Sequence, residues 1–200
     1  MNKANNTEVL DLLQPQKSTV LTRSMQGTEY CVYLHGQINE PSQYYEHYAV
    51  YKSAGPDDLI KLYINSPGGN LATAMEYITH MRDCHAPIMA IIGMDCASAA
   101  TAIALQADGW EVGSFSTFLV HGFSYGIGGN AASVINHANF NTKLNEKFVR
   151  EIYKDFLTEE EINDIFKGVD VLINSDDLMA RLEVIADKRD GEEDEIETDA

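Results

Sequence analysis

Residues 91–101 have the sequence Ile-Ile-Gly-Met-Asp-Cys-Ala-Ser-Ala-Ala-Thr, in which a short apolar run gives way to small, helix-forming residues. Gly93 interrupts the apolar run, and Ser98 lies at the junction of the two parts. A serine at the start of a helix is surrounded by unpaired backbone N–H groups, which suits a nucleophile whose reaction creates a negatively charged oxygen. Serine is also an ordinary helix N-cap, and this stretch on its own favours that simpler interpretation.

The residues before this stretch predict a strand, a helix and a second strand. Residues 59–65 are rich in strand-forming side chains, and Asn70 can cap a helix in which apolar residues recur every three or four positions. Pro87 then separates that helix from residues 88–92, a second apolar strand. A connection of this length predicts parallel strands joined by a right-handed crossover.

The carboxyl ends of these strands carry the candidate site. Ligands bind at this edge of a parallel sheet. Gly68 and Gly69 follow the first strand and Ser98 follows the second, so we expect the three residues to be neighbours. A further predicted strand, residues 117–121, ends at His121 on the same edge.

The pattern of apolar and polar residues along the rest of the chain predicts one α/β domain at residues 24–187. An N-terminal arm (1–23) precedes it, and an acidic tail (188–200), which we expect to be disordered, follows it. Within the domain, the other expected strands cover residues 29–35 and 110–112, with an apolar piece at 171–173. The other expected helices cover residues 42–52, 98–107, 131–156, 158–167 and 175–186.

Composition limits the classes of function. A chain of 200 residues with 44% hydrophobic content suits one domain with a real core. The formal net charge of −17 argues against nucleic acid or an anionic membrane as the main partner. Three cysteines, an odd number without metal-type spacing, indicate a reduced, cytoplasmic location. The sequence has no P-loop, no dinucleotide-binding fingerprint and no cluster with metal-ligand spacing, so we expect no metal or other cofactor. We expect neither a secretory signal nor a membrane span.

Acyl transfer by serine requires a hydroxyl, a base, an orienting carboxylate and two N–H donors. Ser98 supplies the hydroxyl, and His121 is the candidate base, although a lone histidine at a strand end is often structural. Asp170, which follows a predicted helix and begins an apolar segment, is the candidate carboxylate. Asp176 and Asp177 compete with it for that role.

Three motifs occur in order: Tyr-Ile-Asn-Ser-Pro-Gly-Gly at residues 63–69, Gly-Met followed by Ala-Ser-Ala at 93–99, and Phe-Leu-Val-His at 118–121. Together they resemble the proteolytic subunit of the Clp protease, a self-compartmentalised serine peptidase. The resemblance covers about residues 29–185. The short interval between Ser98 and His121 is similar to that of the phage-encoded, head-maturation branch of the family.

The resemblance implies a crotonase-like fold of repeated β-β-α units with a protruding handle helix at residues 131–156. It also implies a set of site residues in three roles. The catalytic residues would be Ser98, His121 and Asp170; the oxyanion-hole donors would be the N–H groups of Gly69 and Ala99; and the residues that bind an extended substrate peptide would be Gly68, Gly126 and Gly129.

The resemblance further implies a homo-oligomer of stacked heptameric rings that hydrolyses peptides or unfolded proteins in an internal chamber. An AAA+ unfoldase would be the partner, but the arm does not resemble the family's axial loop. Asp95-Cys96 and Gly122-Phe123 also depart from the family pattern. Three alternatives remain open: a catalytically silent ring subunit, a phage prohead or scaffold protease that acts without an ATPase in the host cytoplasm, and an acyl-coenzyme A enzyme of the same architecture.

Overall fold

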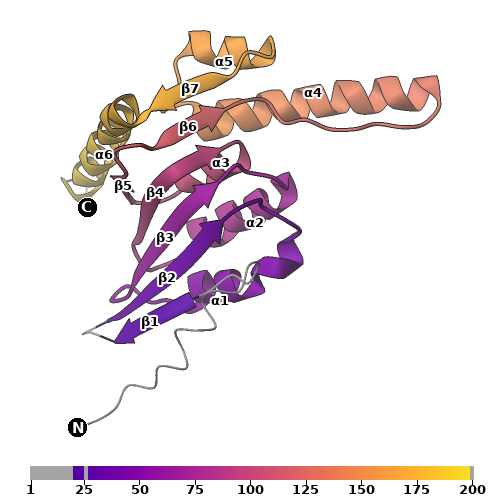
Figure 1. Cartoon of the computed structure of the whole chain (residues 1–200). Helices are drawn as coiled ribbons and strands as arrows, with labels where there is room; N and C mark the ends of the chain where they lie inside the picture. The colour runs from indigo at the N-terminus through magenta and orange to yellow at the C-terminus, as the bar shows by residue number, and fades with distance from the viewer. Residues whose placement is uncertain (1–19, 25–26, 199–200) are drawn as a thin grey trace.

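The structure is a computed structural model that describes residues 20–24 and 27–198, and these form a mixed α/β domain around one sheet (Figure 1). The strands are β1 (Val20–Ser24), β2 (Thr28–His35), β3 (Leu59–Ser66), β4 (Ile88–Ala97), β5 (Gly109–Val112), β6 (Thr117–Val120) and β7 (Val171–Asn174). The helices are the short η2 (Pro41–Tyr44), α1 (Tyr45–Ser53), α2 (Leu71–Arg82), α3 (Ala99–Ala104), α4 (Ala131–Tyr153), α5 (Glu159–Phe166) and α6 (Ser175–Thr198).

The sheet has the order β1-β2-β3-β4-β6-β7, and β5 also pairs with β4. The pairs β2–β3, β3–β4, β4–β5 and β4–β6 are parallel, whereas β1 and β7 are antiparallel edge strands. The predicted α/β class and the predicted parallel pair β3–β4, joined through α2, are therefore confirmed. The carboxyl ends of the parallel strands meet at one edge, where the candidate site lies.

The core forms where alternate strand residues meet the helices. On β3, Ile60, Leu62 and Ile64 are fully buried. They belong to the same core cluster as Tyr77 and Ile78 of α2. Burial of one face in this way holds the sheet against α2 and fixes its register, because a shift by one residue would expose every apolar side chain.

Two strands differ from the sequence prediction. Strand β1 was not predicted: it lies in the last part of the expected arm and pairs antiparallel with β2, whereas residues 1–19 of that arm lie outside the described residues. Strand β4 was expected to end at Ile92 but continues through Gly93 to Ala97. Its first half pairs with β5, and its last three residues pair with β6.

Two helices also differ from their predictions. The long helix ends at Tyr153 rather than Phe156, where the chain turns into the capping box of α5 at Thr158. The last helix, α6, does not end at Ala186 but continues to Thr198, within the acidic tail expected at residues 188–200. Arg189 explains why the helix continues past Ala186, because its guanidinium donates hydrogen bonds to main-chain carbonyls at the end of α3.

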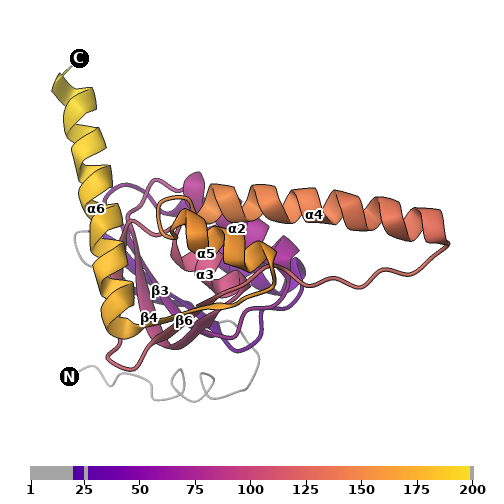
Figure 2. The same cartoon turned by 90° about the horizontal axis from the view of Figure 1, so that it is seen from above.

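Helix α4 projects from the body of the molecule, as expected for a handle (Figures 1 and 2). Residues 121–130 run beside it as an extended strip, and the Tyr125 hydroxyl donates to the carbonyl of Ala138 on α4. Near the body, the side-chain oxygen of Asn145 accepts a hydrogen bond from the N–H of Phe123. None of the helices in the described part of the chain combines the length and the apolar character that a membrane crossing requires.

Candidate active site

Ser98 occupies a strained turn between β4 and α3. Its φ of 55° and ψ of −125° make it the one residue other than glycine with positive φ among the described residues. Such a conformation costs on the order of 1–3 kcal/mol and persists only when the surroundings enforce it. The hydroxyl makes no N-cap hydrogen bond to α3, so the simple N-cap interpretation of Ser98 is wrong. A serine on a sharp strand-to-helix turn presents its hydroxyl to the outside.

The Gly68-Gly69 turn packs directly against Ser98, which confirms that these residues are neighbours. A Cβ on Gly68 would lie 2.5 Å from the carbonyl oxygen of Ala97 and 2.7 Å from the Cβ of Ser98. A Cβ on Gly69 would lie 2.2 Å from the carbonyl oxygen of Ile38. Gly68 also has a φ of 88°, which side chains disfavour. Glycine is required at both positions by the close approach of two other segments.

Two residues that sequence reasoning did not single out hold this turn in place. The buried Ser66 hydroxyl donates to the carbonyl of Gly36 at 2.6 Å and accepts from the N–H of Gly68 at 3.1 Å. Ile38 brackets the turn, because its N–H donates to the Gly68 carbonyl at 2.8 Å and its carbonyl accepts from the Asn70 N–H at 2.9 Å. These contacts join segments about thirty residues apart, so no local pattern signals them.

The candidate oxyanion donors, the N–H groups of Gly69 and Ala99, make no hydrogen bond to any residue that the structure describes. Ala99 follows Ser98 directly, and Gly68, the neighbour of Gly69, packs against both, because a Cβ on Gly68 would lie 2.7 Å from the Cβ of Ser98 and 2.9 Å from the nitrogen of Ala99. Unpaired N–H groups that face a common space can stabilise a negatively charged oxygen.

His121 and Asp170 lie at the ends of adjacent strands. Strands β6 and β7 pair antiparallel with Val120 opposite Val171, and this register places His121 opposite Asp170. Asp176 and Asp177 lie beyond the other end of β7, where their N–H groups bond to the side chain of Asn174.

Within the described chain, no hydrogen bond joins the side chains of Ser98, His121 and Asp170. Asp170 is exposed, and His121 is partly buried. Catalytic hydrogen bonds are often long in structures without substrate and shorten only in the complex.

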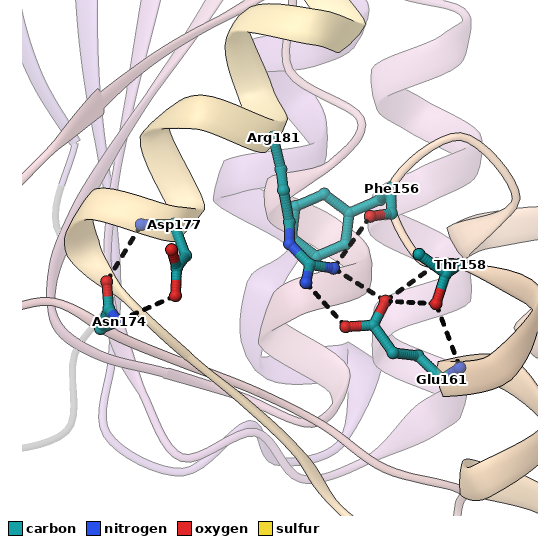
Figure 3. Close-up of polar contacts among 6 residues, drawn as sticks. All are labelled: Phe156, Thr158, Glu161, Asn174, Asp177 and Arg181. Carbon is teal, nitrogen blue, oxygen red and sulfur yellow. Dashed lines mark hydrogen bonds and ion pairs between the residues drawn. The ribbon is translucent and has the colours of Figure 1, made fainter.

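The start of α5, the helix that precedes Asp170, is joined to α6 by hydrogen bonds between Glu161 and Arg181 (Figure 3). Arg181 of α6 makes two hydrogen bonds to the Glu161 carboxylate, at 2.7 and 2.9 Å, and its guanidinium lies over the Phe156 ring. Hydrogen bonding to Arg181 lowers the pKa of Glu161 to about 2. Glu161 also completes the capping box with Thr158 that was predicted for the start of α5. These contacts fix the helix that precedes Asp170.

A pocket of about 770 Å³ is lined by several of the candidate residues, but not by Ala99 or Asp170. Its walls include Gly68, Gly69, Ser98 and His121, together with Leu144 of α4. Leu71, Phe123, Tyr125 and Asn141 also line the pocket, and the sequence did not indicate them as site residues. Gly126 and Gly129 lie farther along the extended strip and do not line the pocket. Their main-chain groups make no hydrogen bond to other described residues.

Asp95 and Cys96 lie in β4, shortly before Ser98. Cys96 is completely buried, as predicted, and burial, followed by the nearby Asp95 charge, raises the pKa of its thiol. Asp95 lies in β4, and its N–H donates to the side chain of Asn65. Nothing in the structure explains why its side chain is a carboxylate. In the described residues, no group of three or more His, Cys, Asp or Glu side chains gathers as a metal site would require.

Comparison with known proteins adds one finding. Residues 13–184 match the family model described as Clp protease, which covers most of the chain. A search of curated proteins finds no match.

Proposed function

Because the chain belongs to the Clp protease family, whose members are serine peptidases, we propose that it hydrolyses peptide bonds with Ser98 as nucleophile. His121 is the general base, and Asp170 orients its imidazole. The observation that carries this proposal is the strained Ser98 turn, with its hydroxyl free of a cap contact and Gly68-Gly69 packed against it. A structural serine needs neither feature.

The proposed reaction starts when Ser98 Oγ forms a bond to the substrate carbonyl carbon while its proton passes to His121. The carbonyl oxygen becomes negatively charged and accepts hydrogen bonds from the N–H groups of Gly69 and Ala99. Cleavage of the C–N bond then transfers the proton from His121 to the leaving amine. Water hydrolyses the acyl ester, with His121 again accepting the proton, and this restores Ser98.

The proposed substrate is an extended peptide that pairs with residues 122–130 through its main chain. The unpaired main chains of Gly126 and Gly129 support this mode, since an added strand needs free backbone groups. Recognition through the main chain tolerates many side chains. Peptides and unfolded chains are therefore the expected substrates, whereas a folded protein would need an AAA+ unfoldase.

We also propose that the site lies inside stacked rings, because members of this family form oligomeric rings. Helix α4 supports this arrangement, since it projects from the body (Figure 2). Its large apolar residues Ile135 and Phe140 are exposed. Exposed apolar side chains on a projecting helix indicate a contact surface.

Labelling with a fluorophosphonate tests the assignment of the nucleophile. We expect one adduct, on Ser98, in the wild-type protein, and none in Ser98→Ala. The matched control is Ser114→Ala, which changes an exposed serine in the loop before β6 and should be labelled like wild type. In the wild-type protein, the rate of hydrolysis of a fluorogenic peptide should fall as the fraction of labelled Ser98 rises. Hydrolysis that persists in Ser98→Ala would overturn the proposal, and a folded ring without any labelling would favour a catalytically silent subunit.

A further inference from the structure

Two buried hydroxyl groups lie next to the Ser98 turn and outside the lining of the pocket. The Thr101 hydroxyl donates to the main-chain carbonyl of Ser98 at 2.6 Å, and the Tyr153 hydroxyl lies 2.7 Å from the Thr101 oxygen. Thr101 is 0% exposed and Tyr153 is 2% exposed. Neither residue lines the pocket, so neither can touch a substrate bound there.

The direction of these hydrogen bonds follows from counting protons. A threonine hydroxyl has one proton, and Thr101 gives it to the carbonyl of Ser98. Tyr153 must therefore be the donor in its bond to Thr101. Burial raises the pKa of Tyr153 well above its ordinary value, so the phenol keeps its proton. The two bonds run in one direction, from Tyr153 through Thr101 to Ser98, and each strengthens the other.

The carbonyl that receives these bonds belongs to the peptide unit between Ser98 and Ala99. This unit is planar and trans, so the direction of the Ser98 carbonyl determines the direction of the Ala99 N–H. The same carbonyl also accepts the main-chain N–H of Thr101 at 3.0 Å. On the other side, the N–H of Ser98 donates to the carbonyl of Leu119, two residues before His121. The main chain of Ser98 is thus held at both of its polar groups.

We propose that Thr101 and Tyr153 are positioning residues that fix the Ser98–Ala99 peptide unit, stabilise the strained Ser98 turn and direct the Ala99 N–H toward the oxyanion. This inference rests on the proposed function, because it assigns a purpose to the geometry of a nucleophile. Tyr153 is the last residue of α4, and Leu144 of the same helix lines the pocket. One helix therefore forms a wall of the pocket and supports the nucleophile turn.

The test removes the hydroxyl groups without changing side-chain volume. Thr101→Val and Tyr153→Phe each break the chain of bonds, and Thr101→Ser keeps it. The matched control is Tyr51→Phe, which removes a phenol that is equally buried but makes no hydrogen bond to any described residue. Three quantities are measured: the rate of fluorophosphonate labelling at Ser98, and the kcat and KM for a fluorogenic peptide.

We expect Thr101→Val to slow labelling and lower kcat on the order of tenfold to a hundredfold, because a small misplacement of catalytic groups has effects of that size. KM should stay within about twofold, since neither hydroxyl contacts the substrate. Tyr153→Phe should have the same effect to a smaller degree. Thr101→Ser should recover most of the activity, and Tyr51→Phe should match wild type.

A change confined to folding would look different. Thr101→Val leaves the Tyr153 phenol buried without its acceptor, so the double variant Thr101→Val/Tyr153→Phe removes both partners if the single variant unfolds. Wild-type labelling rates in the folded double variant would overturn the inference, as would a loss seen only in KM or an equal loss in Tyr51→Phe. If Ser98 of the wild type is not labelled at all, the proposed function fails and this inference fails with it.

Discussion

At the scale of single residues, the site depends on backbone geometry more than on side-chain contacts. Ser98 adopts positive φ, and Gly68 and Gly69 approach other segments too closely to carry a Cβ. The strain at Ser98 must be offset by surrounding contacts, which here are the carbonyl of Leu119 on one side and the Thr101 hydroxyl on the other. Substitutions that alter this backbone should therefore lower activity even when Ser98, His121 and Asp170 are unchanged.

Gly69→Ala tests this dependence on backbone geometry. The added methyl group would meet the carbonyl oxygen of Ile38 at 2.2 Å, so the turn must move and the Gly69 N–H must move with it. We expect at least a hundredfold loss of kcat, on the order of the cost of one oxyanion-hole donor, measured with a fluorogenic peptide. Gly55→Ala is the control, because its nearest neighbour to the new methyl group is 3.8 Å away. Equal activity in the two variants would contradict the role of Gly69.

The identity of the orienting carboxylate gives a second prediction at this scale. Asp170 lies opposite His121 across the β6–β7 pair, whereas Asp176 lies at the start of α6. Asp170→Asn should lower kcat on the order of 10⁴-fold, because the histidine loses the carboxylate that fixes its tautomer. Asp176→Asn makes the same chemical change and should leave kcat close to wild type. A larger loss in Asp176→Asn would move the assignment to α6.

The sequence predicted the residues at the strand ends but not those that support them. Ser98, His121 and the glycine pair follow from one rule, that the carboxyl ends of parallel strands share an edge. Ser66 and Tyr153 make hydrogen bonds to groups distant in sequence: Ser66 to the carbonyl of Gly36, thirty residues away, and Tyr153 to Thr101, fifty-two residues away. Such contacts depend on the final packing, and no local pattern of residues indicates them.

At the scale of elements, local patterns located most helices and strands but gave wrong ends where a distant partner determines them. Asn70 and Thr158 cap α2 and α5 as predicted, because a cap is a contact between residues three apart. Strand β4 extends past Gly93 because β6 pairs with its last residues. Helix α6 extends because Arg189 binds carbonyls more than eighty residues away.

The ion pair between α5 and α6 predicts how stability depends on acid. Arg181 lowers the pKa of Glu161 from 4.5 to about 2, so between these values the unfolded chain binds the proton more readily than the folded one. The contribution is present above about pH 4.5 and is lost as pH falls toward about 2. It should amount to about 1–2 kcal/mol, because the side chains are still 29% and 23% exposed.

Arg181→Gln should therefore lower the free energy of unfolding at neutral pH and flatten its decline between about pH 4.5 and 2, measured by urea unfolding at several pH values. The matched control is Arg150→Gln. Arg150 also pairs with a glutamate of α5, Glu159, but the side chains are 48% and 76% exposed. That variant should change stability by about 0.5 kcal/mol or less. If the free energy of unfolding declined equally steeply between about pH 4.5 and 2 in both variants, the stabilising role of the Arg181–Glu161 pair would be contradicted.

At the scale of the whole molecule, the described residues form a compact body from which α4 projects. The body buries its apolar residues around the sheet, whereas α4 extends away from it with the strip of residues 121–130 alongside (Figure 1). A helix that projects in this way cannot bury both of its long faces against its own chain. Ile135 remains 59% exposed and Phe140 65% exposed. Exposure of large apolar side chains is costly unless another molecule covers them.

This exposure predicts that α4 mediates contact between rings. Ile135→Glu/Phe140→Glu places charges where the second ring would bury apolar side chains. An unpaired buried charge opposes association by roughly several kcal/mol. We expect the assembled mass, measured by native mass spectrometry, to fall to that of a single ring. Lys143→Gln changes an exposed polar residue of the same helix and should leave the mass unchanged. Fluorophosphonate labelling of Ser98 in the double variant would show that the site remains folded. An unchanged mass would assign the contact between rings to another surface, since charged residues in the middle of the interface could not be accommodated.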